Sequence, residues 1–600
     1  MPGFFASISS QTHNETTDVI FKNLPIQQAN MVNDFIKMKD MYVERLTVNK
    51  FLNDKVFYND DNFFILTEGV ILNTFTLIKK YNVKTFRDCI LVMYKLNGET
   101  FFNEFRGSFC GIFYDKKEQL KLIFTDHIGS KQLFYSRNNC GKYFISSDLL
   151  YIIEYFKYKN INRSLNINAS YCLLTLGFMF EDITLFNEIK KILPGHYVKI
   201  KNNLFEIKKF FKLKFSYACN MPEADIINEL DRVFTKAVKI QFDKDIEYGY
   251  KHLVNLSAGL DSRMTTFVAN KLGYGDSILN NTTSQTDYWD EIIPKQIASD
   301  LKHQWVFKSL DNGLYLYDIE KIIKITCGMS LCTGCSHISN FYDVLNMSEY
   351  GIVHTGQIGG CALNPYLSYN NKDKKYSLKL LSSTKYFDLS QKALLVPTLD
   401  FDNEEHFRFF SRALLFNNQG LLSSQRYSET FSPFYDVDFM GFCFSIPLEI
   451  RANHILYHKW INAKHPNAAN YVWSSTGKKI NDNIIKEKVK YYKIFGRKTT
   501  LKQLQYNTLN FIYKRITSHP LPKKNIPCIP NKNNMNPFDY WYNENSDLQK
   551  IINNYFSNNI NVMSDFPDLY NDCIYMFSKG NTDEKMQVIT LIGMKKMYLN

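Results

Sequence analysis

The chain has 600 residues, of which 45% are apolar and 22% are charged, proportions that exclude a wholly disordered or fibrous protein. Its net charge of +13 is spread along the sequence, which favours a solvated surface with some affinity for anions such as nucleotides over a nucleic-acid interface. No apolar run approaches the length of about 18 residues that a membrane span needs, and the first residues show no secretory signal. We therefore expect the twelve cysteines to be reduced thiols of a cytoplasmic protein, with no membrane or nucleic-acid partner.

The first 215 residues predict a β-rich domain. Short alternating segments separated by glycines are typical of hairpins, and they occur at residues 62–66, 109–114, 120–125, 132–136 and 143–146. An amphipathic helix at residues 225–242 follows a change of composition, which places a predicted domain boundary near residue 215.

Strands and helices alternate after this boundary. Predicted strands at residues 253–256, 276–283 and 304–307 enclose predicted helices at residues 262–272 and 288–301. This order implies right-handed crossovers and a parallel sheet. Beyond residue 375 the chain is predicted to be mainly helical, and the tail at about 485–600 shows helices but no chemistry.

Residues 253–263 (Leu-Val-Asn-Leu-Ser-Ala-Gly-Leu-Asp-Ser-Arg) pass from a buried strand through small and hydroxyl residues into a helix. Small residues let backbone N–H groups approach an anion, and a helix N-terminus adds partial positive charge. The predicted nucleotide contacts are Leu256, Ser257, Gly259, Asp261 and Ser262. Among them, Asp261 is the predicted Mg²⁺ ligand. An ordinary strand–turn–helix with a serine cap is the alternative, and the absence of Gly-Lys-Ser/Thr excludes a Walker loop.

The segment Ser257-Ala258-Gly259-Leu260-Asp261-Ser262 resembles the pyrophosphate loop, Ser-Gly-Gly-Leu-Asp-Ser, of the asparagine synthetase family, whose members cleave ATP to AMP and pyrophosphate. Residues 352–360 (Ile-Val-His-Thr-Gly-Gln-Ile-Gly-Gly) resemble the family's second nucleotide segment, and residues 432–436 (Ser-Pro-Phe-Tyr-Asp), followed by Ile-Pro-Leu-Glu at 446–449, resemble its third. Residues 105–115, 125–135 and 144–148 are similar to its glutaminase-domain core.

This resemblance implies an α+β N-terminal-nucleophile-like sandwich domain at residues 1–215, followed at 216–600 by an α/β parallel-sheet ATP-pyrophosphatase domain with a helical C-terminal extension. It implies ATP and Mg²⁺ as cofactors, with Thr355 and Gly356 joining the loop at the nucleotide. It also implies Asp436 and Lys478 as catalytic residues, although an ordinary surface lysine is the alternative for Lys478.

The first domain departs from the family at its glutaminase residues. The family uses an N-terminal cysteine as nucleophile, and here Pro2 stands in its place, with no nucleophilic side chain. The motif Asn-Gly-Glu, which holds the substrate in the family, corresponds to Glu68-Gly69-Val70 here. We therefore expect this domain to keep its fold but not to hydrolyse glutamine.

The second domain departs at an acidic cluster that follows Ser/Thr-Gly in the family. The matching positions here include Gln357, Gly360 and Cys361, which carry no carboxylate. Because Mg²⁺ prefers carboxylates together with substrate phosphates, this loss weakens the predicted metal site. Asp261 alone, or with help from an acid among Asp287, Asp290 and Glu291, would then hold the ion.

The implied activity is ATP-dependent formation of an amide bond. A small-molecule or peptide carboxylate would be adenylated with release of pyrophosphate, and free ammonia or an amine would then attack it, as in β-lactam synthetases and lasso-peptide cyclases, relatives without a working glutaminase. The alternative is a non-catalytic nucleotide-binding or scaffold homologue, favoured by the missing acids. A homodimer, and a lid or dimerisation role for the first domain, are further hypotheses.

Three further patterns are interpreted as structural. Cys327, Cys332, Cys335 and His337 match an iron–sulfur spacing in part, but the segment is predicted to be a helix with packed thiols. His354 is interpreted as a core histidine with its polar atoms satisfied. The tail aromatics Phe538, Tyr540, Trp541 and Tyr542 are interpreted as packed core residues rather than base-stacking ones.

Overall fold

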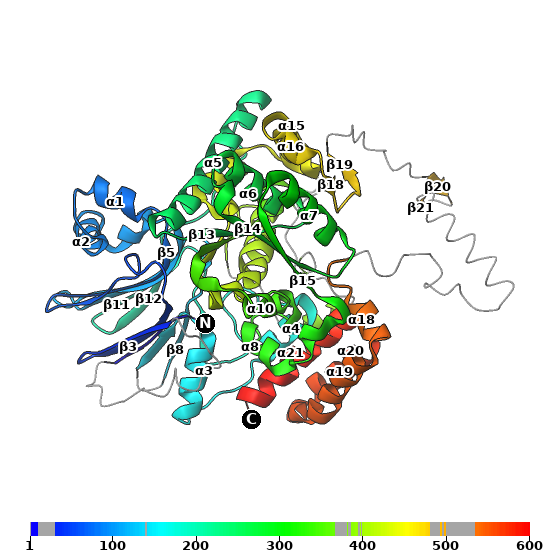
Figure 1. Ribbon diagram of the computed structural model, residues 1–600. Helices are drawn as coiled ribbons and strands as arrows, with labels where there is room; N and C mark the ends of the chain where they lie inside the picture. Colours follow the sequence, from blue (N-terminus) through cyan, green and yellow to red (C-terminus); the bar gives the residue numbers. More distant parts are fainter. Residues whose placement is uncertain are drawn as a thin grey trace.

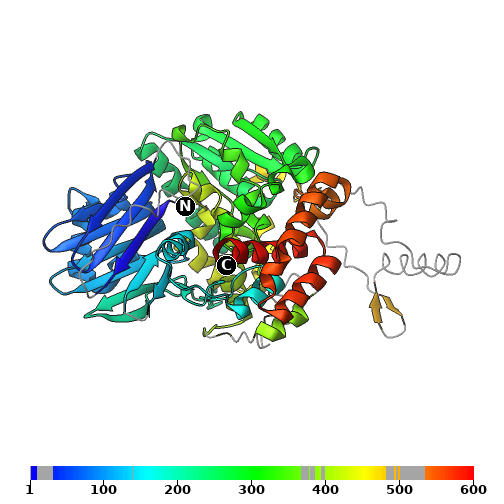
Figure 2. The same cartoon turned by 90° about the horizontal axis from the view of Figure 1, so that it is seen from below.

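The computed structural model describes residues 2–9, 31–138, 141–365, 386–393, 399–480 and 534–599, with a few short stretches between 378 and 499. Its first part holds two stacked six-stranded sheets in which every neighbouring pair of strands is antiparallel (Figures 1 and 2). The first sheet has the order β10 (Ile189–Lys191), β8 (Phe134–Arg137), β9 (Tyr143–Ser146), β1 (Gly3–Ile8), β3 (Met41–Val48) and β2 (Met31–Lys37). The second has the order β12 (Leu204–Lys209), β11 (His196–Lys201), β7 (Leu120–Thr125), β6 (Gly107–Asp115), β5 (Phe63–Ile71) and β4 (Phe57–Asn59).

Strand β6 shows why the two sheets stack. Successive side chains of a strand point to opposite faces, and Cys110 and Ile112 belong to the cluster between the sheets. Phe109 and Phe113 belong instead to a second cluster, beneath α1 (Thr74–Lys80), α2 (Phe86–Asn97) and η1 (Gly98–Glu104). With α3 (Leu149–Tyr158) and α4 (Ile167–Leu176) on the outer face of the first sheet, the result is a four-layer α-β-β-α sandwich. The α+β sandwich expected for this part is confirmed.

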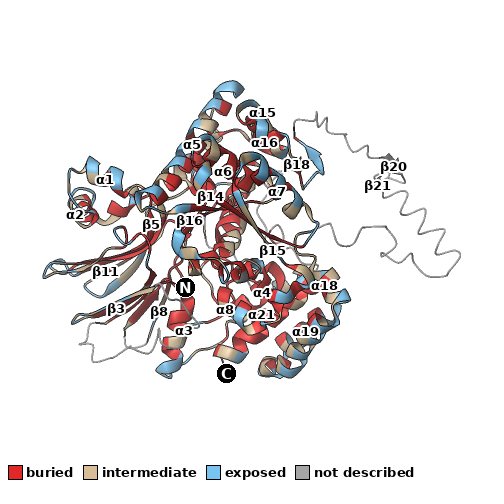
Figure 3. Ribbon diagram, in the orientation of Figure 1, coloured by how far each residue is buried: buried red, intermediate tan, exposed pale blue. Residues whose placement is uncertain are grey.

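The predicted parallel sheet is also present. Its order is β15 (Gln304–Ser309), β14 (Ile278–Ser284), β13 (Lys251–Asn255), β16 (Tyr350–His354) and β17 (Thr430–Phe431), and all four pairings are parallel. The central strands are buried on both faces, as is typical of parallel sheets (Figure 3). Helices α5 (Glu223–Glu247), α6 (Leu260–Lys271) and α7 (Trp289–Leu301) accompany it.

The chain leaves β13 toward β14 and β15 on one side, whereas β16 and β17 lie on the other. The point between β13 and β16 is therefore a topological switch point, where open α/β sheets bind ligands at the carboxyl ends of their strands.

The C-terminal helices do not form a separate unit. These are α18 (Phe538–Glu544), α19 (Ser546–Asn559), α20 (Pro567–Lys579) and α21 (Thr582–Tyr598). One hydrophobic cluster joins them to α3 and α4 of the sandwich and to α8 (Ile319–Thr326) (Figure 2). Trp541 is buried in this cluster, with Phe538, Tyr540 and Tyr542 packed against it, which confirms the packing interpretation of the tail aromatics. Most of the predicted tail before residue 534 lies outside the described residues. Among the described residues, no helix has both the length and the hydrophobicity needed to cross a bilayer.

The cysteine-rich segment is not one helix, contrary to our expectation. Helix α8 ends at Thr326, and the next residue, Cys327, has a left-handed φ of 47°. A short helix α9 (Thr333–Ser336) carries Cys335. Cys327 and Cys332 pack in one hydrophobic cluster and Cys335 in another, and burial raises the pKa of the Cys332 thiol to about 12. Within the described part of the chain, these thiols do not converge on one point.

Candidate functional site

A cavity of about 440 Å³ opens at the switch point of the parallel sheet. The structure brings all seven sequence-predicted nucleotide residues into its lining: Leu256, Ser257, Gly259, Asp261, Ser262, Thr355 and Gly356. The first five follow β13 and the last two follow β16, so the adjacency of these strands in the sheet gathers residues about 100 positions apart.

The turn after β13 is held by its own serines. The Ser257 N–H donates to Ser262 Oγ at 3.0 Å, and the two hydroxyl oxygens lie 2.9 Å apart. The Gly259 N–H donates to Ser257 Oγ at 3.2 Å. Helix α6 then begins at Leu260 after Gly259, without a side-chain cap. Because the first N–H groups of a helix lack intrahelical partners, this end of α6 is suited to an anion.

The loop after β16 packs directly on this turn. A Cβ at Gly356 would lie 2.2 Å from the backbone nitrogen of Ser262, and one at Gly359 would lie 2.7 Å from Cγ of Asp261. The Thr265 hydroxyl donates to the Thr355 carbonyl at 3.2 Å. Both glycines are therefore required by the close approach of the two loops.

Both carboxylate oxygens of Asp261 accept hydrogen bonds from distant parts of the chain. The Gly360 N–H donates to Oδ2 at 2.7 Å, and the Tyr457 hydroxyl, on α15 (Ile455–Lys464), donates to Oδ1 at 2.9 Å. Burial raises the pKa of Asp261 to about 6, and these two donors act in the opposite direction. Gly360, one of the positions that lack an acid, thus supplies an N–H to the remaining acid.

Of the three additional acids considered for Mg²⁺, only Asp290 lines the cavity. Its Oδ1 accepts the Ala258 N–H at 2.7 Å, and burial raises its pKa. Glu291 instead accepts the N–H of Asp287 at 2.6 Å. A carboxylate offers about four lone-pair positions, so Asp261 and Asp290 both keep acceptor capacity. Carboxylate oxygens are the ligands that a hard divalent cation prefers, so Asp261 and Asp290 are the residues that could hold such an ion.

We expect Mg²⁺ binding to this cavity to weaken as the pH falls through about 6, because a proton competes with the cation for Asp261. Above this pH the carboxylate is ionised and affinity reaches a plateau; below it, affinity falls by up to about tenfold per pH unit. Titration of Mg²⁺ in the presence of ATP from pH 5 to pH 8 measures this. An affinity that is flat across the range would contradict the assignment.

Asp436 does not line this cavity, and its catalytic role stays a prediction. Its Oδ1 accepts the N–H groups of Asp438 and Phe439, each at 3.0 Å, and so caps α13 (Val437–Ser445). It lines a small crevice with Arg106 and Asp126, apart from the main cavity. The pattern Ser-Pro-Phe-Tyr-Asp at residues 432–436 therefore marks the start of α13, which Asp436 caps.

The catalytic role of Lys478 stays a prediction. The residue is exposed on β19 (Lys478–Lys479), which pairs with β18 (Val472–Trp473). Its partner Trp473 lines the cavity and Lys478 does not. Among the described residues, the cavity lining includes no lysine or arginine.

Sequence reasoning missed several residues of the cavity. Tyr457 is 196 positions from Asp261, and no local pattern marks it. The same holds for Asn281, Ser424, Trp473 and Met535, which come from separate elements.

His354 has the structural role that we predicted, although one ring atom is unsatisfied. His354 Nε2 and His252 Nδ1 lie 2.7 and 2.9 Å from the same oxygen of buried Asp245. Nδ1 of His354 is buried without a hydrogen-bond partner among the described residues.

Comparison with known proteins identifies the first part of the chain. Residues 44–211 match the family described as the glutamine amidotransferase domain. Amidase chyE of Penicillium rubens is 25% identical over 207 residues, which are 33% of this chain and 29% of that protein. The glutamine-hydrolyzing asparagine synthetase B of Escherichia coli is 23% identical over 195 residues, 32% of this chain and 29% of that protein. The chain thus contains a glutamine amidotransferase-like region, and its matches span less than a third of these curated relatives.

Solved structures give weaker likenesses. The glutamine phosphoribosylpyrophosphate amidotransferase of B. subtilis has a TM-score of 0.22 and 8% identity, with 51% of this chain and 59% of that chain covered. An allosteric regulatory enzyme of purine biosynthesis has a TM-score of 0.23 and 9% identity, with 42% and 54% covered.

Proposed function

We propose that the protein is an ATP-dependent, AMP-forming amide-bond synthetase without glutaminase activity. The observation that carries this proposal is the cavity at the switch point, where the turn after β13 and the loop after β16 meet above the N-terminus of α6. In this proposal Ser257, Gly259 and Ser262 contact the phosphates of ATP, and Asp261 with Asp290 holds Mg²⁺ on them. A small-molecule or peptide carboxylate is activated with release of pyrophosphate, and ammonia or an amine then displaces AMP.

The chemistry of the lining supports this use. Backbone N–H groups and hydroxyls contact an anion without carrying charge, and Mg²⁺ supplies the positive charge that the described lining lacks.

We expect the protein to release no glutamate from glutamine. Pro2 is buried at the start of β1 and carries no nucleophile. Glu68, at the position of the family's asparagine, accepts the Thr47 hydroxyl at 2.8 Å and lies 3.9 Å from Lys55 Nζ, with its side chain fully buried. Because both positions are changed, Pro2→Cys alone is also expected to be inactive. Glutamate measured above the buffer blank with the wild type would contradict this.

The decisive experiment is calorimetric titration of ATP, with and without Mg²⁺, into the wild type and Asp261→Asn. We expect the wild type to bind MgATP and the variant to lose the Mg²⁺-dependent part, with affinity reduced by at least about tenfold. Asp287→Asn is the matched control, because Asp287 is exposed and does not line the cavity. If the wild type does not bind MgATP, the proposal fails.

A non-catalytic nucleotide-binding homologue is the second candidate. Two observations favour it: the described cavity lining has no lysine or arginine, and both oxygens of Asp261 are already hydrogen-bonded. Release of pyrophosphate separates the two functions. A synthetase releases it from MgATP in an Asp261-dependent way when a suitable carboxylate is present, whereas a binding protein retains intact ATP with every carboxylate offered.

A further inference from the structure

One loop of the glutamine amidotransferase-like region has a rigid shape. This docking loop comprises residues 126–132 and follows β7. The carboxylate of Asp126 accepts the N–H groups of Ile128, Ser130 and Lys131 at 3.0 to 3.1 Å. With three backbone donors on one buried carboxylate, the loop presents its remaining polar groups in fixed directions.

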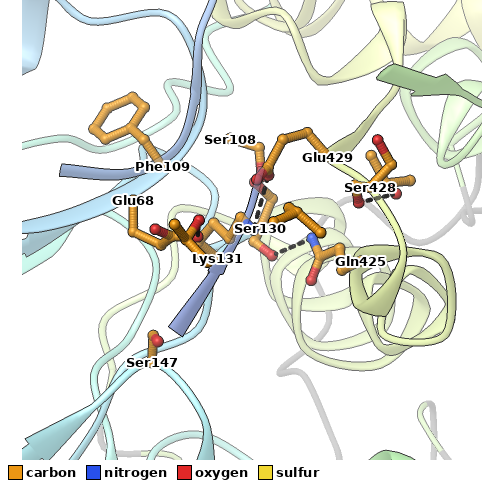
Figure 4. A network of polar contacts seen from close by, with 12 residues as sticks. Glu68, Ser108, Phe109, Ser130, Lys131, Ser147, Gln425, Ser428 and Glu429 are labelled. Atoms are coloured by element: carbon orange, nitrogen blue, oxygen red, sulfur yellow. Dashed lines mark hydrogen bonds and ion pairs between the residues drawn. The ribbon is translucent and has the colours of Figure 1, made fainter. Parts of the chain in front are cut away.

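The docking loop contacts a segment of the second part of the chain, residues 417–426, which we call the wall segment. Three side-chain amides make the connection. Asn418 donates to the Ile128 carbonyl at 3.3 Å, Gln425 donates to the Ser130 carbonyl at 3.1 Å, and Gln132 donates to Gln419 Oε1 at 3.1 Å. All six residues are buried, and Figure 4 shows Gln425 reaching Ser130.

The wall segment turns its other residues to the nucleotide cavity. Gly420, Leu421 and Ser424 line it, between the residues that contact the docking loop. Gln357, which follows Thr355-Gly356, donates to the Asn417 carbonyl at 2.6 Å. One short segment therefore joins the docking loop to the cavity.

A second connection runs through Glu429, just after the wall segment. Its carboxylate lies 2.8 Å from Nζ of both Lys55 and Lys131, which come from the first part of the chain. Figure 4 shows Lys131 and Glu429. The Glu429 carbonyl accepts the Val353 N–H at 2.8 Å, so the ion-paired residue also begins the pairing of β17 with β16. The strand that leads to Thr355 is thus attached to the same docking loop.

We propose that the glutamine amidotransferase-like region acts as a built-in positioning element for the nucleotide cavity. The docking loop holds the wall segment and β17 in the arrangement that gives the cavity its shape. Gln132 and Gln425 are positioning residues, because they act on the ligand only through the wall segment. The region thereby has a role that needs no glutaminase chemistry. The choice of MgATP as a probe rests on the proposed function, but the positioning itself does not.

The test uses the full chain with Gln132→Leu and Gln425→Leu combined. These changes keep side-chain size and remove two amide donors. We expect amide hydrogen exchange in the wall segment to become at least about tenfold faster, since buried contacts protect it. We also expect MgATP affinity, measured well below the melting temperature, to fall about tenfold, a size typical of coupling between sites. Lys80→Ala is the control, because the ion pair of Lys80, on α1, with Glu104 is solvent-exposed and is not one of the hydrogen bonds between the docking loop and the wall segment.

Unchanged hydrogen exchange in the wall segment would overturn the proposal. Unchanged MgATP affinity together with a lowered melting temperature would also overturn it, because a merely structural role predicts this combination. If the wild type does not bind MgATP, the proposed function fails while hydrogen exchange still decides the positioning role. If the double variant does not fold, Gln132→Leu alone is measured in the same two ways.

Discussion

Replacement of Glu429 by glutamine is expected to lower the free energy of unfolding by about 3–5 kcal/mol, because it removes one partner from a buried ion-pair network. Burial opposes ionisation of Glu429, but Lys131 and Lys55 hold its pKa well below the usual range. The side chains of Glu429 and Lys55 are fully buried, and that of Lys131 nearly so. Glutamine would leave two buried ammonium groups, with the carboxylate of Glu68 3.9 Å from Nζ of Lys55. Chemical denaturation of wild type and variant measures the loss.

Two controls make this result specific. Lys80→Ala breaks an exposed pair and is expected to cost at most about 1 kcal/mol. The combination Lys55→Met, Lys131→Met, Glu429→Leu and Glu68→Gln removes the charges together, including that of buried Glu68 beside Lys55, and is expected to recover most of the lost stability. A loss below about 1 kcal/mol in Glu429→Gln would show that the buried pairs do not hold the two parts of the chain together.

Under the proposed function, Gly356→Ala is expected to lower MgATP affinity by about 100-fold. The added Cβ would lie 2.2 Å from the Ser262 nitrogen and 2.6 Å from the Asp261 carbonyl carbon. These are backbone atoms, so the loop after β16 must move away from the turn after β13. Overpacking of this kind costs about 1–3 kcal/mol of stability, and a displacement of about 1 Å costs about 100-fold where geometry is critical. Calorimetry with MgATP and thermal melting measure the two effects.

Gly441→Ala is the matched control. Gly441 is exposed in α13, and a Cβ there would meet nothing within 4 Å. Alanine in a helix is expected to stabilise the protein by about 0.5–1 kcal/mol and to leave binding unchanged. Equal MgATP affinity in Gly356→Ala and the wild type would mean that the nucleotide does not bind where the two loops meet.

Local patterns predicted the elements of the parallel sheet well. Between residues 253 and 307 the predicted strands and helices end within two residues of the observed ones. Helix α5 extends five residues past its predicted end at residue 242. Its last turns carry the polar residues Lys244 and Asp245, which interrupt the apolar pattern. Both are buried against distant parts of the chain, where Lys244 pairs with Asp54 and Asp245 accepts the N–H of Ile352. The cysteine-rich segment was predicted wrongly, since the break at Cys327 depends on tertiary packing.

The strand–turn–helix, the β-rich first part and the set of small and hydroxyl residues around Asp261 could be predicted from local patterns, because these features depend on contacts between near neighbours and on side-chain periodicity. Three features of the site could not: the hydrogen bonds from Tyr457 and Gly360 to Asp261, the presence of Asp290 rather than Asp287 or Glu291 in the cavity lining, and the helix cap made by Asp436. The core that the C-terminal helices share with the sandwich could not be predicted either. These contacts join residues far apart in the chain, and the packing of whole elements selects their partners.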